Sequence, residues 1–206
     1  MLESRKFLVK EKIKFLSSHA TYEIYDGETQ KRTGTAEEDI GAFVRVMRWL
    51  VSKQLMPTRV EVRETPDNAL VFTVSRGWFL FRARVEIRDA QGVLVGYLKS
   101  KLFSFGGGFL VYDAKDQQFA DVKGNLFGFK YRVLTPDGGF EMGKVSKEWG
   151  GLAKELFTSA DSYMIEVHDD LHEQPIAKML VLAAALAVDM IFKSEKKGGI
   201  SGLIGE

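Results

Sequence analysis

The feature that most constrains this 206-residue chain is a helix-like segment without a polar face near the carboxyl end. Residues 176–192 read IAKMLVLAAALAVDMIF, in which only Lys178 and Asp189 are charged. A helix that is apolar on all sides must be enclosed by protein or by lipid. The uninterrupted apolar run covers only residues 179–188, whereas a bilayer span needs about 20 residues. The sequence therefore predicts a buried core helix and no transmembrane segment.

Most of the chain before this helix has the alternating pattern of β-strands. Residues 7–15 and 21–25 alternate, and residues 85–96, 110–122 and 131–143 each read as two strands joined by a turn that contains Asp. Asp and Gly adopt the positive-φ conformations that tight hairpins require. Strands at such regular spacing indicate an antiparallel sandwich or barrel.

The apolar helix decides between these two architectures. A sandwich packs its own sheets together and leaves no space for such a helix, whereas a barrel of more than about eight strands has an interior that must be filled. We therefore expect a mainly β protein: a closed antiparallel barrel that encloses a hydrophobic C-terminal helix. Its core side chains would be Met179, Leu180, Leu182, Leu186, Met190 and Phe192.

Residues 36–54 follow helical spacing instead. Thr35 and Glu38 have the spacing of a capping box at the start of this segment. The predicted amphipathic helix would cover one end of the barrel. Val46 and Trp49 lie off its main apolar stripe, so that docking to a membrane or to a protein partner is the alternative.

Composition limits the function classes. The net charge of +1 gives no global field towards nucleic acid or an anionic membrane, so that nucleic acid is not expected as a partner. The absence of cysteine excludes disulfides, thiolate metal sites and cysteine nucleophiles. The first residues lack the apolar core of a signal peptide, and we expect a cytoplasmic protein. It would form one domain over residues 1–206, with a flexible Gly-rich tail at 194–206.

The C-terminal third resembles the phospholipid scramblase family. The resemblance lies in residues 141–151 (EMGKVSKEWGG), residues 155–163 (ELFTSADSY) and the apolar helix that ends in VDMIF. The chain is also similar to the plant LURP-one-related proteins, which share the architecture of the Tubby C-terminal domain. The resemblance implies a barrel of twelve strands around a central C-terminal helix. It also implies a non-enzymatic protein that associates with phospholipids, phosphoinositides or transcriptional partners.

The same resemblance places a degenerate calcium loop at residues 159–170. Ser159, Asp161, Ser162 and Asp170 fall on its ligand positions, but the first is Ser where Asp is expected, and Met164 replaces the Gly of the turn. Calcium needs six to eight oxygen ligands and a sharp turn. A plain turn followed by a last strand at 163–167 is therefore favoured, and no cofactor is expected.

Two further motifs have structural explanations. His168 and His172 would share a metal only if their segment were helical, and a solvated loop before the helix is favoured. The glycines 106–108 lack the lysine and the helix of a phosphate-binding loop, which favours a hairpin turn. No arrangement of residues predicts catalysis, so that we expect no enzyme.

Basic residues on alternating strand positions are the candidate lipid site. Their common property is a predicted outward direction on neighbouring strands; they are Lys99, Lys101, Lys123, Lys130 and Arg132. Such a patch could bind a phosphoinositide head group, as in the Tubby domain that this chain resembles. The alternative is a solvated face on which cations pair with Glu86, Asp116 and Asp121.

Three functions follow from these observations. The first is a non-catalytic protein that binds anionic phospholipid or phosphoinositide head groups at the membrane surface. The second is lipid scrambling, which would need a passage through the membrane. The third is a soluble protein-interaction or regulatory module that docks through residues 36–54.

Overall fold

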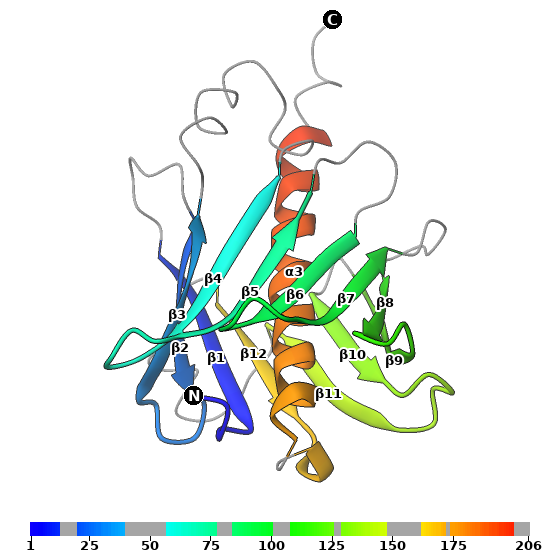
Figure 1. The fold of residues 1–206 in the computed structure, drawn as a ribbon, viewed down its shortest axis with the longest axis horizontal. Coiled ribbons are helices and arrows are strands. Elements are labelled where there is room, and N and C mark those ends of the chain that lie inside the picture. Colours follow the sequence, from blue (N-terminus) through cyan, green and yellow to red (C-terminus); the bar gives the residue numbers. More distant parts are fainter. Residues whose placement is uncertain are drawn as a thin grey trace, which may run out of the picture.

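The computed structural model describes residues 1–12, 20–39, 57–77, 84–100, 108–125, 129–147, 162–171 and 174–199. Twelve antiparallel strands form a closed barrel around one long helix, as Figure 1 shows. The predicted architecture is therefore confirmed.

The strands follow one another around the barrel in chain order, and β1 closes it against β12. Their bounds are β1 Lys6–Lys12, β2 Thr21–Asp26, β3 Arg32–Asp39, β4 Thr58–Glu64, β5 Leu70–Arg76, β6 Arg84–Asp89, β7 Leu94–Ser100, β8 Gly108–Asp113, β9 Gln118–Asn125, β10 Lys130–Leu134, β11 Glu141–Ser146 and β12 Ser162–Val167. A short 3-10 turn, η2 (Asp169–Leu171), connects β12 to the helix α3 (Pro175–Gly199).

Alternation of side chains explains why these segments are strands. In β10, Tyr131 and Val133 are buried, whereas Lys130 and Arg132 are exposed. Successive side chains of a strand point to opposite faces, so that one face of each strand packs inwards and the other meets solvent. The sequence pattern thus predicts which cations point outwards.

The described hairpin turns all lie at the end of the barrel where α3 begins (Figure 1). Asp89 and Asp113 form two of them in the same way. The Oδ1 atom of Asp89 accepts hydrogen bonds from the main-chain N–H groups of Gln91 and Val93, and that of Asp113 accepts from those of Lys115 and Gln117. The positive φ falls on Gly92 in one turn and on Asp116 in the other. The recurring hairpin pattern of the sequence therefore has one structural cause.

Helix α3 fills the interior of the barrel. Its residues 177–188 are all buried, including Met179, Leu180, Leu182 and Leu186; the side chains of Met190 and Phe192 lie outside the described part of the structure. Pro175 suits the first helical position because its missing N–H would have no partner there. A Cβ atom on Gly96 of β7 would lie 2.9 Å from Cδ2 of Leu180 and would also meet the carbonyl oxygen of Tyr112. The missing side chain at residue 96 therefore lets the wall approach the helix.

The predicted helix at 36–54 is wrong at its start, because residues 36–39 belong to β3. Glu38 does not cap a helix: its carboxylate is buried and accepts a hydrogen bond from the main-chain N–H of Ala20. Burial lowers the pKa of Arg76, and the negative charge of Glu38 acts against that shift. Strand pairing with β4 and this buried charge therefore outweigh the local helical spacing. Residues 40–54, including Val46 and Trp49, lie outside the described residues.

Two boundaries also differ from expectation. Helix α3 continues to Gly199 rather than ending at residue 192, so that residues 194–199 of the expected tail are helical. Strand β1 ends at Lys12, and residues 13–15 of the expected strand lie outside the described part. The described part of the chain contains no helix that is long and apolar enough to cross a membrane.

Candidate anion-binding surface

Five charged residues form a row across the outside of five neighbouring strands. Lys123 of β9 pairs with Arg132 of β10, Arg132 with Lys144 of β11, Lys144 with Glu166 of β12, and Glu166 with Lys6 of β1. Directly paired residues have Cβ atoms about 5 Å apart. We call these five residues the charged row; its first three members are cations on adjacent strands.

The cations of the row are more exposed than the carboxylates that accompany them. The side chains of Lys123, Arg132 and Lys144 are 58%, 65% and 49% exposed, whereas their partners Asp121, Glu141 and Glu166 are 13%, 35% and 36% exposed. Because the carboxylates lie deeper, solvent meets the positive ends of the pairs first.

The three cations form ion pairs on the surface of the barrel. The Nζ–Oδ2 distance from Lys123 to Asp121 is 3.7 Å, and the Nζ–Oε2 distance from Lys144 to Glu166 is 3.2 Å. The Arg132 Nε atom donates a hydrogen bond of 2.5 Å to Glu141. Ion pairs on a surface contribute only about 0–1 kcal/mol, so that a competing phosphate could displace these carboxylates at small cost.

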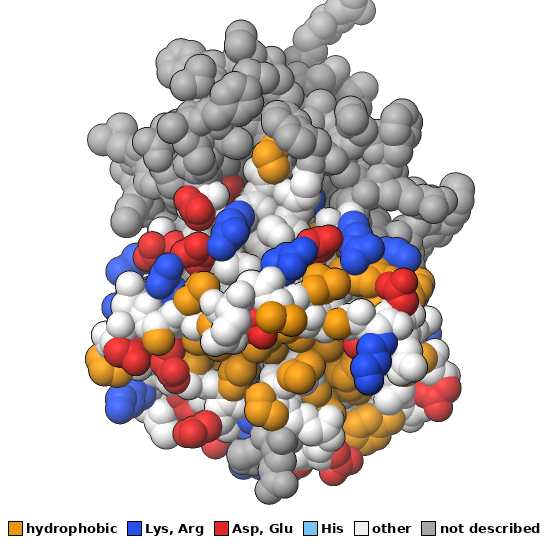
Figure 2. Space-filling model, viewed as in Figure 1, with side chains coloured by type: hydrophobic (Ala, Val, Ile, Leu, Met, Phe, Trp, Pro, Cys, Tyr) orange, Lys and Arg blue, Asp and Glu red, His pale blue; other side chains and the backbone are white. Residues whose placement is uncertain are grey.

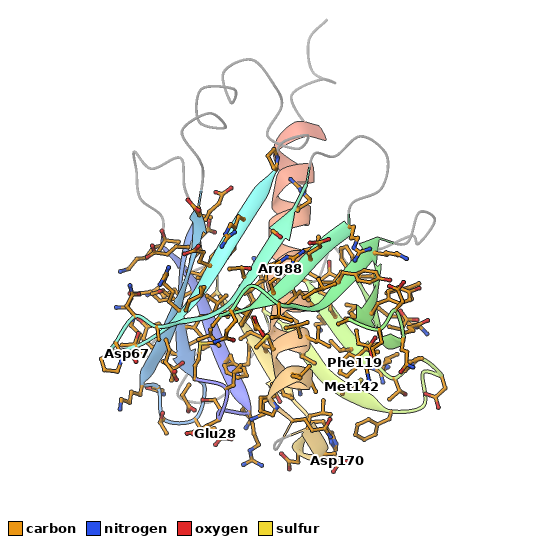
Figure 3. All side chains as sticks on the ribbon, viewed as in Figure 1. Glu28, Asp67, Arg88, Phe119, Met142 and Asp170 are labelled. Atoms are coloured by element: carbon orange, nitrogen blue, oxygen red, sulfur yellow. The ribbon has the colours of Figure 1, made fainter. Side chains whose placement is uncertain are left out.

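A cleft of about 340 Å³ lies at the β1 end of the charged row. Its lining side chains carry both signs of charge: Arg5, Lys6, Lys144, Glu28, Glu141, Glu166 and Asp169, together with His168. The Nη1 atom of Arg5 donates a 2.7 Å hydrogen bond to Asp169, which raises the pKa of Arg5, and Lys6 lies 3.5 Å from Glu28. Figure 3 labels Glu28 and Asp170 at the end of the barrel where α3 begins.

The structure brings together only some of the predicted basic residues. Lys123 and Arg132 are direct neighbours, and Lys130 is exposed on the same face of β10 as Arg132. Lys99 lies on β7, two strands away from β9. Lys101 lies outside the described residues.

Lys99 belongs to a separate cluster over two stacked rings. The rings of Tyr97 and Tyr112 are 5.0 Å apart and nearly parallel. The Arg84 guanidinium lies 3.7 Å from the Tyr97 ring centre, and the Lys99 ammonium lies 4.7 Å from that of Tyr112. The Tyr97 hydroxyl donates a 2.5 Å hydrogen bond to Asp116, which raises the pKa of Tyr97.

Sequence reasoning did not find Lys144, Lys6 and Arg5. Alternation predicts that Lys144 points outwards, but not that it lies beside Arg132. Lys6 reaches the row only because the first and last strands pair. These positions therefore depend on strand order and register, for which a single sequence carries no local signal.

The outer face of β4 and β6 shows the expected solvated arrangement. Arg59 and Arg63 flank Glu61 on β4, and Arg84 and Arg88 flank Glu86 on β6, with nitrogen–oxygen distances of 2.7 to 3.6 Å. Figure 2 shows that Lys and Arg side chains are interspersed with Asp and Glu side chains over the face of the molecule that it presents. The expected pairing of cations with Glu86 and Asp121 occurs, whereas Asp116 accepts from Tyr97.

The proposed calcium ligands are not gathered at one point. Ser162 begins β12 and is buried, whereas Asp170 lies in η2, beyond the end of that strand. A six-residue strand is about 20 Å long, which is too far for both residues to bind one ion. Ser159 and Asp161 lie outside the described residues.

The histidine pair is described only in part. His168 is exposed, and its ring is nearly perpendicular to that of Phe140 at a centroid distance of 4.5 Å. His172 lies outside the described residues. Glycines 106 and 107 also lie outside, and Gly108 begins β8. Among the residues that the structure describes, no three His, Asp or Glu side chains are placed to hold a metal.

Comparison with known proteins gives one family. Human phospholipid scramblase family member 5 is 28% identical over 122 residues, which is 56% of this chain and 44% of that protein. Bovine phospholipid scramblase 2 is 28% identical over 120 residues, or 55% of this chain and 40% of that protein. The chain thus matches less than half the length of these relatives, and no solved structure matches it significantly. Residues 9–195 match the Scramblase family, and the chain belongs to that family.

Proposed function

We propose that this protein is a non-catalytic, peripheral phospholipid-binding protein of the cytoplasm that holds anionic head groups against the charged row. The observation that carries the proposal is the direct pairing of Lys123, Arg132 and Lys144 on adjacent strands. Membership of the Scramblase family supports a phospholipid as the ligand.

The charge of the whole molecule does not provide this affinity. A net charge of +1 gives little long-range attraction, so that binding must come from cations placed close together. Each Lys or Arg near an anionic membrane surface contributes about 1 kcal/mol. Three adjacent cationic side chains with exposed charged ends are therefore sufficient for weak, salt-sensitive binding.

The distribution of charge also favours one orientation on a membrane. The end of the barrel with the hairpin turns exposes the carboxylates of Glu28, Asp67, Asp116, Asp137, Asp169 and Asp170, together with fewer cations, namely Lys31, Arg32 and Lys115. Because the carboxylates outnumber these cations, this end attracts an anionic membrane less than the side formed by β9–β11 does. We therefore infer that the barrel lies with the side formed by β9–β11 against the head groups.

Flotation with vesicles tests the proposal. Vesicles that contain phosphatidylglycerol or a phosphoinositide should carry the protein upwards at low salt, and neutral vesicles should not. The double variant Lys123→Gln/Arg132→Gln should weaken binding about thirtyfold, from two lost contributions of about 1 kcal/mol.

The double variant Arg59→Gln/Arg63→Gln is the matched control. It removes the same two charges from the outer face of β4, away from the row. Equal loss in the two double variants would mean that binding follows net charge alone. No flotation of the unaltered protein at low salt would reject the proposed function.

A further inference from the structure

The cleft beside β1 differs from the rest of the charged row because both signs of charge line it. Arg5 and Lys6 lie at the start of β1, and Lys144 lies across β12 from them. Glu166 stands between Lys144 and Lys6 in the register, and Glu141 lies on the β11 side. Glu28 and Asp169 also line the cleft.

Ligands of a single sign do not fit this cleft well. A simple anion would meet four carboxylates, and a simple cation would meet Arg5, Lys6 and Lys144. The described carboxylates form no group that could hold a metal ion. The charges are complementary to a ligand that carries an anion and a cation close together.

The positions of the charges suggest how such a ligand would lie. Arg5 has a planar group with several N–H donors, which suits the oxygens of a phosphate. Its present partner Asp169 is 72% exposed, and therefore easily displaced. Glu166 is 36% exposed, lines the cleft and pairs in the register with both Lys6 and Lys144, so that an ammonium could take the place of Lys144 beside it.

We propose that this cleft binds a phosphodiester that carries a primary ammonium on a short linker, as in the phosphoethanolamine head group. The phosphate contacts Arg5 and Lys6, and the ammonium contacts Glu166 and Glu141. Ligand clefts have volumes of about 300–1,000 Å³; a volume of about 340 Å³ suits a head group without its acyl chains. This inference rests on the proposed function and assigns it a preferred head group.

Titration with soluble head groups, followed by amide chemical shifts, tests the chemistry directly. Glycerophosphoethanolamine should bind at least tenfold more tightly than glycerophosphoglycerol, which has the same phosphodiester and no amine. Glycerophosphocholine should also bind less well, because its quaternary ammonium cannot donate a hydrogen bond. The shifts should be largest for residues 5–6, 144 and 166–169.

Glu166→Gln should reduce the affinity for glycerophosphoethanolamine about tenfold and remove the preference for the amine. Glu61→Gln is the matched control, because Glu61 is also a carboxylate between two cations on the outer wall but lies far from the cleft on β4. It should leave both affinities unchanged. Circular dichroism establishes that each variant is folded.

Flotation with vesicles distinguishes a membrane lipid from a free phosphodiester as the ligand. Flotation that increases when phosphatidylethanolamine is added to phosphatidylglycerol vesicles supports a lipid ligand, whereas binding only to soluble glycerophosphoethanolamine supports a free phosphodiester. Equal affinity for glycerophosphoethanolamine and glycerophosphoglycerol overturns the inference. If flotation onto phosphatidylglycerol vesicles persists in that case, the proposed function survives without it.

Discussion

The Nζ atom of Lys178 donates a hydrogen bond of 2.7 Å to the main-chain carbonyl oxygen of Leu2. A second bond of 3.2 Å reaches the carbonyl oxygen of Glu3. Lys178 lies in α3 and is fully buried, so that the start of the chain is tied to its last helix. The ammonium is held by main-chain oxygens at the end of the barrel where α3 begins.

This buried ammonium predicts a pH-dependent stability. Burial lowers the pKa of Lys178 below its ordinary value. Between the folded pKa and the ordinary value, only the unfolded chain binds the proton, so that stability rises with pH in that window. Lys178→Ala should remove this rise and lower the free energy of unfolding by about 2–4 kcal/mol, because a cavity and two unpaired carbonyls remain.

Urea unfolding from neutral pH to pH values near the ordinary lysine pKa measures this effect. The exposed turn residue Lys115 provides the control, and Lys115→Ala should keep the dependence of the unaltered protein. A parallel pH dependence of the unaltered protein and Lys178→Ala would contradict the prediction.

The turn after β2 predicts a second rise of stability with pH, in the acidic range instead of the alkaline range. Burial acts against the charge of Asp26, but its hydrogen bonds outweigh that effect and lower its pKa. They come from the Ser4 hydroxyl and from the main-chain N–H groups of Glu28 and Thr29. Asp26→Asn should cost about 1–3 kcal/mol at neutral pH.

This contribution is present above the unfolded pKa and is lost as the pH falls through the lower, folded pKa. The difference between the unaltered protein and Asp26→Asn should therefore shrink in acid. Thermal unfolding at neutral and acidic pH measures it. A difference that stays constant into strong acid would show that the charge of Asp26 has no part in stability.

Close packing of β7 against α3 should make the protein sensitive to a larger residue at Gly96. Gly96→Ala places a methyl group against Leu180 and against the carbonyl oxygen of Tyr112, which is main chain and cannot move aside. The free energy of unfolding should fall by about 1–3 kcal/mol. In the control Gly77→Ala, the new Cβ atom meets nothing within 4 Å, and stability should be nearly unchanged; equal effects of the two substitutions would argue against close packing at β7.

Removal of the Glu141 carboxylate should strengthen binding to anionic vesicles. Glu141→Gln removes the partner of Arg132, so that the guanidinium is free for a phosphate. Flotation onto phosphatidylglycerol vesicles should strengthen several-fold, since one added charge near the membrane is worth about 1 kcal/mol. Glu61→Gln adds the same charge on β4 and should have little effect. An equal gain in both variants would place the binding surface elsewhere.

Local chemistry of the sequence accounts for most of the barrel. Alternation in β10 separates Tyr131 from Lys130, and a carboxylate at Asp89 or Asp113 forms a hairpin within a few residues. The apolar run in α3 requires enclosure wherever it lies. Each of these features depends on neighbours close in the chain, and each was therefore predictable.

The local sequence pattern gave the wrong secondary structure at residues 36–39. Their spacing favours a helix, yet they pair with β4, and the carboxylate of Glu38 is used inside the barrel. Tertiary hydrogen bonds outweigh a weak local preference when the two disagree.

The amino-acid order by itself determined the strands, the hairpins and the buried helix, because their side-chain periods follow from backbone geometry. The tertiary structure alone decided which charges on different strands became neighbours. Lys6 and Glu166 are 160 positions apart and meet only because β1 closes the barrel against β12. Register is a property of two strands together, and it places Lys123, Arg132 and Lys144 side by side and opens the cleft beside them.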